Sequence, residues 1–374
     1  MTVSLMEELR DYIRSSGPIP FESFMRRVLY HPQFGYYASR VPGAGGDYGT
    51  SPSLTPWFGR LVAVELQRMW ESIGRPDPFT VVEAGAGRAD LAAGALAALG
   101  SLRGDLAGAL RWRFVERFDG VAALQRRRLG PLAASAEWSQ ELAPPTGEPP
   151  VSGCVIAHEV LDNFPVHLLE VAPSGELCEV YVDLDQRGAD QERLVQRLGP
   201  LTIAPAAGLA GAAAGLAPGR RLEVCGAVDA WVADAGRAIA SGYVLIVDYG
   251  DVEPDLWVRN PQGTVVTYGP DGFGEDPLVD PGLRDVTAEV NFSAVERAAR
   301  LHGFEPEPLT CQRDWLLSLG HDDVVAGLVH AADRAVAEGR DADALAIEGE
   351  LSEVQALVGR LGYGDIMVFR ARKA

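Results

Sequence analysis

The sequence predicts an α/β fold with a mostly parallel sheet that is covered by helices on both faces. From Phe79 onward, short apolar runs alternate with helical patterns, which indicates strands joined by helical crossovers. The first apolar run, FTVVEAG, ends at an acid and leads through two glycines into an Ala/Leu helix. A chain of 374 residues with 47% hydrophobic content can bury such a sheet in one large domain with additions.

The residues before Phe79 predict short helices joined by turns. Ser4 and Glu7 have the spacing of a capping box, and the helix that follows carries its apolar residues at helical spacing, namely Leu5, Leu9, Tyr12 and Ile13. A second helix is expected at about 21–30 and a third from Pro56. Between them lies a broken stretch rich in Gly, Pro and Tyr. We therefore treat residues 1–78 as an N-terminal helical segment with a glycine-rich loop.

The rest of the chain carries the strands of the predicted sheet. In chain order they are expected at 79–85, 110–117, 133–138, 151–160, 242–250 and 365–373. Helices are expected at 89–100 and 120–129, then from a capping box at Ser293 and Glu296 through Leu301, and near 322–338 and 343–361.

Two stretches interrupt this alternation of strands and helices. Residues 168–184 predict a hairpin, because two alternating runs flank the turn Pro173-Ser174-Gly175. An Ala/Gly/Pro segment at about 199–219 follows it and has the composition of a flexible connection. Residues 251–291 form the second irregular stretch. We therefore expect one domain over 79–374, with insertions at about 167–222 and 251–291.

Composition excludes several classes of protein. The net charge of −19 disfavours nucleic acid as a partner, since such binding relies on Lys and Arg contacts to phosphates. We interpret the charge as favouring solubility, and it also suits a basic substrate such as an arginine-bearing protein. No apolar run is long enough to span a membrane, and the N-terminus lacks the pattern of a signal peptide.

The four cysteines indicate neither a zinc site nor a disulfide framework, and we expect no metal. They are widely scattered and form no Cys-x-x-Cys pair, lying at Cys154, Cys178, Cys225 and Cys311. We expect a cytoplasmic protein with reduced thiols. The sequence does not predict the oligomeric state.

The turn EAGAGRADL after the first strand predicts a nucleotide-type cofactor site. The dinucleotide fingerprint needs Gly or Ala at its third glycine position, where this chain has Asp90, and a carboxylate there would repel a pyrophosphate. No Gly-Lys-Ser/Thr follows, so the phosphate-binding P-loop is excluded. We therefore disfavour a nicotinamide oxidoreductase.

S-adenosylmethionine, which has no phosphate, fits the turn better. Glu83 could meet the ammonium or sulfonium side of this ligand, while N–H groups near Gly85 and Gly87 meet its carboxylate. Glu116 ends the second strand, where an acid can accept hydrogen bonds from both ribose hydroxyls. A strand-end acid and an ordinary tight turn are the alternatives for Glu83 and the glycines.

Several further segments, taken in order with this turn, resemble the MidA-like family of S-adenosylmethionine-dependent methyltransferases. This family includes the mitochondrial complex I assembly-factor protein arginine methyltransferases. The segments span residues 17 to about 316 and read GPIPF, YHPQFGYY, GGDYGTSP, EAGAGRADL, VIAHEVLDNFPV, VLIVDYG and DVTAEVNFSAV. The chain departs from the family pattern at Ser53 and His158, where the family usually has Glu and Asn, and in a turn with fewer glycines.

The resemblance implies a class I (Rossmann-like) methyltransferase fold, with a seven-stranded, mostly parallel sheet and added substrate-side segments. It also implies that the glycine-rich loop is a lid over the cofactor, with contacts from Gly46, Asp47, Thr50 and Ser51. The methyl acceptor it implies is an arginine side chain of a protein. A small-molecule methyltransferase and a non-catalytic assembly factor on the same scaffold remain the alternatives.

Candidate catalytic residues follow the strand at 151–160. Ligands of parallel sheets bind outside the carboxyl ends of the strands, which is where His158, Glu159 and Asp162 lie. A guanidinium must be held and lose a proton, and carboxylates can do both. We therefore expect Glu159 as the first choice of base and Asp162 as the second.

The alternatives for these residues are structural. Asp162 could cap a helix, and His158 could be a packed strand-end histidine. At the end of the next strand of the sheet, Tyr249 is expected to line the substrate pocket, with Asp248 either beside it or anchoring loops. The resemblance gives no role to Asp285, Thr287 or Asn291.

Overall fold

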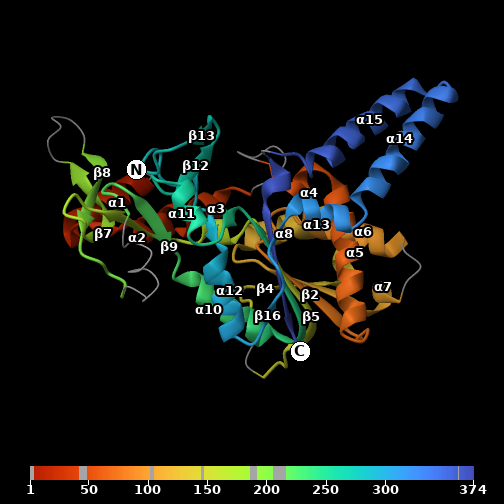
Figure 1. Cartoon of the computed structure of the whole chain (residues 1–374), viewed down its shortest axis with the longest axis horizontal. Coiled ribbons are helices and arrows are strands. Elements are labelled where there is room, and N and C mark those ends of the chain that lie inside the picture. The colour runs from red at the N-terminus through yellow and green to blue at the C-terminus, as the bar shows by residue number, and fades with distance from the viewer. Residues whose placement is uncertain are drawn as a thin grey trace. The chain divides into compact units, whose positions relative to one another are not determined.

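The computed structural model describes residues 4–41, 49–101, 105–144, 147–185, 192–204, 216–360 and 362–374 (Figure 1). The chain divides into two compact units, and each is assembled from three separate stretches of sequence. Unit 1 comprises Met1–Arg40, Leu161–Ala230 and Gly250–Ala294. Unit 2 comprises Val41–Val160, Trp231–Tyr249 and Val295–Ala374.

Unit 2 contains the predicted α/β sheet. Within the described residues the sheet has eight strands, in the order β16-β18-β10-β5-β2-β3-β4, with β17 also paired to β18. The five strands from β10 to β4 are parallel, and β18 runs antiparallel to β10. The bounds are β2 (Phe79–Ala84), β3 (Leu110–Val115), β4 (Ala136–Ser139), β5 (Val151–His158), β10 (Ile239–Asp248), β16 (Glu305–Pro306), β17 (Thr310–Cys311) and β18 (Met367–Lys373).

Apolar composition explains why these segments are strands. Every residue of β2 is buried, as expected for a central strand with both faces covered by helices. The mixed, mainly parallel sheet is therefore confirmed, whereas the count of seven strands is not. The two-residue strands β16 and β17 pair with different stretches of β18, which accounts for the additional strand.

The described residues of unit 2 also form helices. They are α4 (Ser51–Leu54), α5 (Pro56–Ser72), α6 (Asp90–Ser101), α7 (Leu106–Ala109), α8 (Asp119–Leu129), α13 (Gln312–Ser318), α14 (His321–Ala337) and α15 (Asp341–Ala356), with 3-10 turns η1 (Gly130–Ser135) and η3 (Tyr363–Asp365). Helices α5 and α6 approach closely: a Cβ added to Gly59 would lie only 2.5 Å from the carbonyl oxygen of Leu91, so glycine is required at this contact. Helices α14 and α15 lie side by side as a helical hairpin (Figure 1).

Unit 1 is built mainly from antiparallel strands. A five-stranded sheet has the order β1-β7-β6-β9 with β8 paired to β7, and two smaller sheets have the orders β13-β12-β14 and β11-β15. The bounds are β1 (Ile19–Pro20), β6 (His167–Val171), β7 (Leu177–Asp185), β8 (Arg193–Gly199), β9 (Arg221–Val224), β11 (Gly250–Asp251), β12 (Val266–Gly269), β13 (Gly272–Gly274), β14 (Asp285–Thr287) and β15 (Val290–Asn291). The predicted hairpin is confirmed as β6 and β7.

Short helices accompany these sheets. They are α1 (Leu5–Ser16), α2 (Phe21–Tyr30), α3 (Tyr36–Ser39), α11 (Asp255–Arg259) and the 3-10 turn η2 (Leu161–Asn163). Helices α10 (Ala227–Ala238) and α12 (Phe292–Leu301) contain residues of both units. The stretch we expected to lack regular structure contains α3 and α4, while 205–215 of the Ala/Gly/Pro segment lie outside the described residues.

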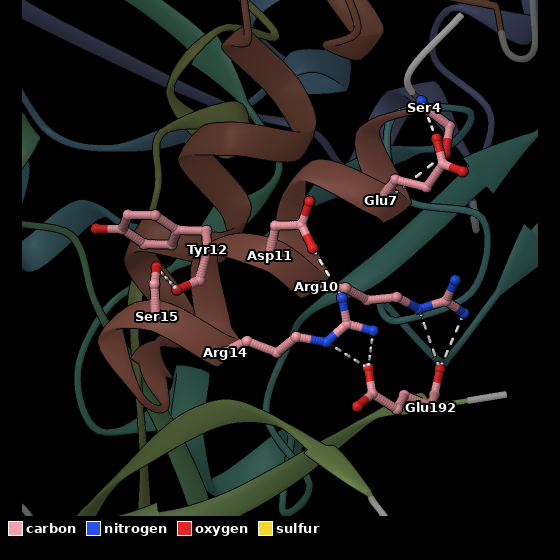
Figure 2. A network of polar contacts seen from close by, with 8 residues as sticks. All are labelled: Ser4, Glu7, Arg10, Asp11, Tyr12, Arg14, Ser15 and Glu192. Atoms are coloured by element: carbon pink, nitrogen blue, oxygen red, sulfur yellow. Dashed lines mark hydrogen bonds and ion pairs between the residues drawn. The ribbon is translucent and has the colours of Figure 1, made fainter. Parts of the chain in front are cut away.

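The first helix confirms the predicted capping box and is tied to β8 by side chains (Figure 2). Ser4 Oγ accepts from the Glu7 amide, and the Glu7 carboxylate accepts from the Ser4 amide. Arg14 donates to the Glu192 carboxylate, and Arg10 donates to the Glu192 carbonyl oxygen, just before β8 begins. Tyr12 does not join the buried face, since it is 38% exposed.

The second predicted capping box is wrong. The amide of Ala294 donates to Asn291 Oδ1, so Asn291 caps α12. The hydroxyl of Ser293 instead accepts from the amide of Glu253, in the preceding insertion. The spacing Ser-x-x-Glu was present. However, Asn291, two residues earlier, offers a side-chain oxygen that can cap the helix equally well, and the serine hydroxyl is engaged by a tertiary contact.

Candidate functional site

The glycine turn between β2 and α6 has three residues in the left-handed region. Gly85 has φ 60°, Gly87 has φ 51° and Ala89 has φ 63°. Glycine adopts this backbone without strain, which explains the two glycines of the motif. A Cβ on Gly85 would also lie 2.9 Å from Cγ2 of Val160, so the turn packs tightly on the residue that follows Glu159.

Glu83 lies beneath this turn. The side chain is buried, and the Trp112 indole donates to Oε2 at 2.8 Å. Burial is the main reason that the pKa of Glu83 is raised to about 8; the hydrogen bond from Trp112 lowers this pKa, and the nearby Asp90 adds to the rise. The carboxyl that we expected to meet the cofactor directly is therefore engaged inside the protein.

Glu116 lies beyond the end of β3 and is connected to the turn through Gln125 of α8. Glu116 Oε1 accepts from the amide of Phe118 at 3.0 Å, and Oε2 accepts from Gln125 Nε2 at 3.2 Å. The same Nε2 donates to the carbonyl oxygen of Gly87 at 3.0 Å. The structure therefore brings together two predicted features, the glycine turn and the second-strand acid. Nothing in the sequence singled out Gln125.

Asp90 begins α6 and has cationic neighbours. Arg128 Nε donates to Oδ1 at 3.0 Å, and Arg88 Nε lies 3.5 Å from Oδ2. These arginines compensate the charge that we expected to repel a pyrophosphate. The carboxylate at this position thus has a structural partner, which the spacing of the motif did not predict.

His158 and Glu159 lie at the carboxyl end of β5, where ligands of parallel sheets bind. Glu159 has a strained backbone, with φ 50°. Both side chains are buried, and His158 Nδ1 lies 3.6 Å from Glu159 Oε1. Among the described residues, neither Glu159 Oε1 nor His158 Nε2 has a hydrogen-bond partner. A buried carboxyl oxygen without a donor is exceptional and marks a candidate functional site.

The electrostatics of this pair favour neutral side chains. Burial raises the pKa of Glu159 well above its usual range, the neighbouring Asp248 raises it further, and a hydrogen bond with the backbone of Ser51 lowers it. Burial lowers the pKa of His158 to about 3, so the imidazole is uncharged at neutral pH. His158 also packs edge-on against Phe58, as in the packed-histidine alternative.

Asp248 and Tyr249 end the neighbouring strand β10. Asp248 is fully buried, and its carboxylate accepts from the amides of Val160 at 3.1 Å and Tyr249 at 2.9 Å. It thus anchors the segment after Glu159, which was one of the two roles we considered. Tyr249 is 40% exposed.

The residues of the predicted lid are only partly described. Gly46 and Asp47 lie outside the described residues. Thr50 forms a capping box with Ser53 at the start of α4. Ser51 is fully buried, and its hydroxyl donates to Gln312 Oε1 at 3.1 Å, so this side chain is engaged within unit 2.

Asp162 belongs to unit 1, within the short turn η2. It is buried, and its carbonyl oxygen accepts from the amide of Ala288 at 2.8 Å. In the same unit, Asp285 is fully buried and accepts from the hydroxyl of Tyr37 and the side-chain amide of Asn163. Asp285, in the second insertion, is therefore bonded to the N-terminal segment and to the turn η2, which precedes the first insertion.

Two other features concern the described residues alone. No group of three or more potential metal ligands is found there, and the four cysteines are free. Among the described helices, none combines the length and the apolar character that crossing a bilayer requires.

Comparisons with known proteins agree on one family. The family described as "Putative S-adenosyl-L-methionine-dependent methyltransferase" matches residues 61–309. The curated relative "Protein arginine methyltransferase NDUFAF7 homolog, mitochondrial" of Drosophila melanogaster is 32% identical over 323 residues, covering 80% of this chain and 71% of the relative. The mouse protein, "Protein arginine methyltransferase NDUFAF7, mitochondrial", is 30% identical over 346 residues, covering 85% and 74%.

A solved structure extends the similarity to almost the whole chain. A protein from Burkholderia thailandensis, crystallised bound to S-adenosyl-homocysteine, has 31% identity and a TM-score of 0.84, covering 99% of this chain and 92% of that chain. A second crystal structure from the same organism has 30% identity and a TM-score of 0.81. The predicted α/β methyltransferase fold and the predicted cofactor are therefore confirmed.

The prediction of a cytoplasmic protein is contradicted. The curated relatives are mitochondrial proteins by name. Scattered cysteines and the lack of a secretory pattern argue against an oxidising compartment, but they do not distinguish the cytoplasm from other reducing compartments.

Proposed function

This chain belongs to the family of S-adenosyl-L-methionine-dependent methyltransferases, and we propose that its methyl acceptor is an arginine side chain of a protein. The names of the relatives, which describe protein arginine methyltransferases, support this acceptor. The net charge of −19 also suits a basic partner.

We propose that the cofactor lies against the glycine turn and Glu116. Within the described part of the chain, the amides of Ala86 and Gly87 make no hydrogen bond, so they remain available to a carboxylate. A carboxylate has about four lone-pair sites, so Glu116 keeps acceptor capacity for ribose hydroxyls. The residues present thus fit S-adenosylmethionine.

One observation carries the proposal for the acceptor. Oε1 of Glu159 is buried at the carboxyl end of β5, and no described residue donates a hydrogen bond to it. A guanidinium has five N–H donors and favours carboxylate partners, so it would satisfy this oxygen. Its positive charge would also lower the pKa of Glu159, because an opposite charge favours the ionised carboxylate.

The chemistry asks for a group that holds the guanidinium and accepts one proton. When bound, S-adenosylmethionine supplies a methyl group. The bond between this methyl group and the sulfonium breaks as a bond to the guanidinium nitrogen forms, and the sulfur keeps the electron pair. Ionised Glu159 would orient that nitrogen and accept the proton it loses. Asp162, in unit 1, is our second choice, and the neutral imidazole of His158 would pack beside Glu159 without contributing a charge.

For the architecture, we propose the seven-stranded class I arrangement, with β16 and β17 as one interrupted edge strand. We also keep the proposed division at residue 78 and the insertions at about 167–222 and 251–291. Unit 1, which contains much of both insertions, supports the insertions, whereas residues 41–78 belong to unit 2.

The test is methyl transfer from labelled S-adenosylmethionine to proteins of a cell extract, followed by mass spectrometry. We expect label on arginine side chains. Label found on small metabolites alone would contradict the acceptor and favour a small-molecule methyltransferase, whereas cofactor binding without any transfer would favour a non-catalytic assembly factor.

Substitution of Glu159 tests the proposed base. Glu159→Gln keeps the size of the side chain but cannot accept a proton, so transfer should slow by about 100-fold or more, as general bases commonly contribute. Binding of the cofactor should change little. Glu141→Gln, at an exposed acid in a loop of unit 2, is the matched control. An unchanged rate for Glu159→Gln would exclude this residue as the base.

A further inference from the structure

Gln125 of α8 makes three hydrogen bonds that connect separate elements of unit 2. The side chain is fully buried. Nε2 donates to the carbonyl oxygen of Gly87 at 3.0 Å and to Glu116 Oε2 at 3.2 Å, while Oε1 accepts from the indole of Trp138 at 2.9 Å. The glycine turn, the end of β3 and the edge strand β4 therefore meet at one amide.

We propose that Gln125 is a positioning residue for the cofactor, which fixes the distance between the glycine turn and Glu116 so that one ligand can contact both. The inference rests on the proposed location of S-adenosylmethionine at these two features. It goes further by assigning a role to a side chain that does not itself need to touch the ligand.

The orientation of the amide follows from Trp138. An indole N–H can only donate, so it requires an acceptor and holds Oε1 of Gln125 toward β4. The NH2 group then faces the opposite way, and its two hydrogens match the two acceptors at Gly87 and Glu116. Glutamine is the only residue with this length that offers two donors and an acceptor.

The bond to Glu116 also affects the ligand site electrostatically. Burial raises the pKa of Glu116, whereas hydrogen bonds from the amides of Phe118 and Arg117 and from Gln125 lower it. Donation from Gln125 thus favours the ionised carboxylate, which is the stronger acceptor for hydroxyl groups.

A second contact from the same helix holds the other end of the turn. Arg128, one helical turn beyond Gln125, donates to Asp90 at the start of α6. The Arg128 side chain is about half exposed, and exposed ion pairs contribute little. We therefore expect Gln125 to carry most of the positioning.

Calorimetry on the full chain can test this role with two ligands, S-adenosylhomocysteine and its 2′-deoxy analogue. Gln125→Leu should raise the Kd for S-adenosylhomocysteine at least ten-fold. The loss of affinity caused by Gln125→Leu should be smaller for the 2′-deoxy analogue, because that ligand already lacks one of the hydroxyls that Glu116 would bind. Gln67→Leu removes a helical glutamine whose side chain donates to Glu71 of the same helix, and it should leave both Kd values unchanged.

An unchanged Kd in Gln125→Leu, or an equal loss for both ligands, would overturn the inference, since general destabilisation does not distinguish them. If Gln125→Leu fails to fold in a thermal melt, Gln125→Glu decides. It keeps an acceptor for Trp138 but has at most one proton to donate and cannot bridge Gly87 and Glu116, so a Kd within two-fold of the wild type would overturn the role. Glu116→Ala separates failure of the proposed ribose site from failure of the role of Gln125. Unchanged affinity for S-adenosylhomocysteine in this variant would refute the ribose site itself.

Discussion

Alanine at Gly85 tests whether the turn is shaped by the protein before any ligand binds. Two effects add. An L-residue at φ 60° costs about 1–2 kcal/mol relative to glycine. The new Cβ would also lie 2.9 Å from Cγ2 of Val160, and overpacking of this kind typically costs about 1–3 kcal/mol. We therefore expect Gly85→Ala to destabilise unit 2 by about 2–5 kcal/mol.

The assay is thermal unfolding without ligand, read as a shift of the melting midpoint. For a domain of 150–250 residues, each kcal/mol shifts the midpoint by about 2–4 °C. Gly100→Ala is a matched control near the end of α6, because its added Cβ would meet no described atom within 4 Å beyond its own helix and chain neighbours, and its φ is not in the left-handed region. This variant should be neutral or slightly stabilised.

A double substitution separates the two effects. Val160→Ala removes the methyl groups that the new Cβ would meet, so Gly85→Ala combined with Val160→Ala should destabilise by less than the sum of the single changes. The backbone strain would remain. Strict additivity, or a melting midpoint of Gly85→Ala equal to that of the wild type, would refute our account of the turn.

Three further predictions concern the same units. Gly87→Val should abolish binding of S-adenosylmethionine in calorimetry, because a branched side chain at φ 51° blocks and strains the turn, and unchanged affinity would exclude the turn as the site. The folded-state pKa of Glu83, about 8, exceeds its unfolded value, so its stabilising contribution is complete below about pH 4.5 and is lost as the pH rises toward 8. Glu83→Gln should therefore flatten that decline, which reaches at most about 1.4 kcal/mol per pH unit in denaturant titrations at several pH values, and an unchanged slope would contradict the raised pKa. Ser4→Ala should lower the stability of unit 1 by about 1 kcal/mol through loss of the capping box, and no loss in urea unfolding would show that the cap contributes nothing.

Periodicity predicted most of the sheet of unit 2 because its strands are central and apolar. The run FTVVEAG could be assigned without knowledge of its neighbours, since a strand covered on both faces is apolar throughout. Edge strands carry less information. The two-residue strands β16 and β17 exist only through pairing with β18, so no local pattern could separate or count them.

In unit 1 the locally encoded parts were predicted, namely the β6–β7 hairpin and the first two helices, whereas their assembly could not be predicted because distant contacts hold it together. Asp285 accepts hydrogen bonds from Tyr37 and Asn163, which belong to segments more than a hundred residues away in the sequence. The same reason explains the wrong cap of α12. Ser293 satisfied the local rule, yet its hydroxyl accepts from Glu253 of another segment. Local patterns predict which side chains could cap a helix, and tertiary contacts determine which of them accepts the hydrogen bond.

The candidate site shows a related limit. The sequence placed the predicted ligand contacts at one edge of the sheet, and several of these residues have side chains engaged within the protein. Glu83 holds the indole of Trp112, Ser51 holds Gln312, and Asp248 holds two backbone amides. The two bonds of Asp248 fix the main chain just after β5 and β10. A motif residue can therefore be required for the shape of a site, while in our proposal the ligand binds backbone amides and the remaining acceptor sites of Glu116.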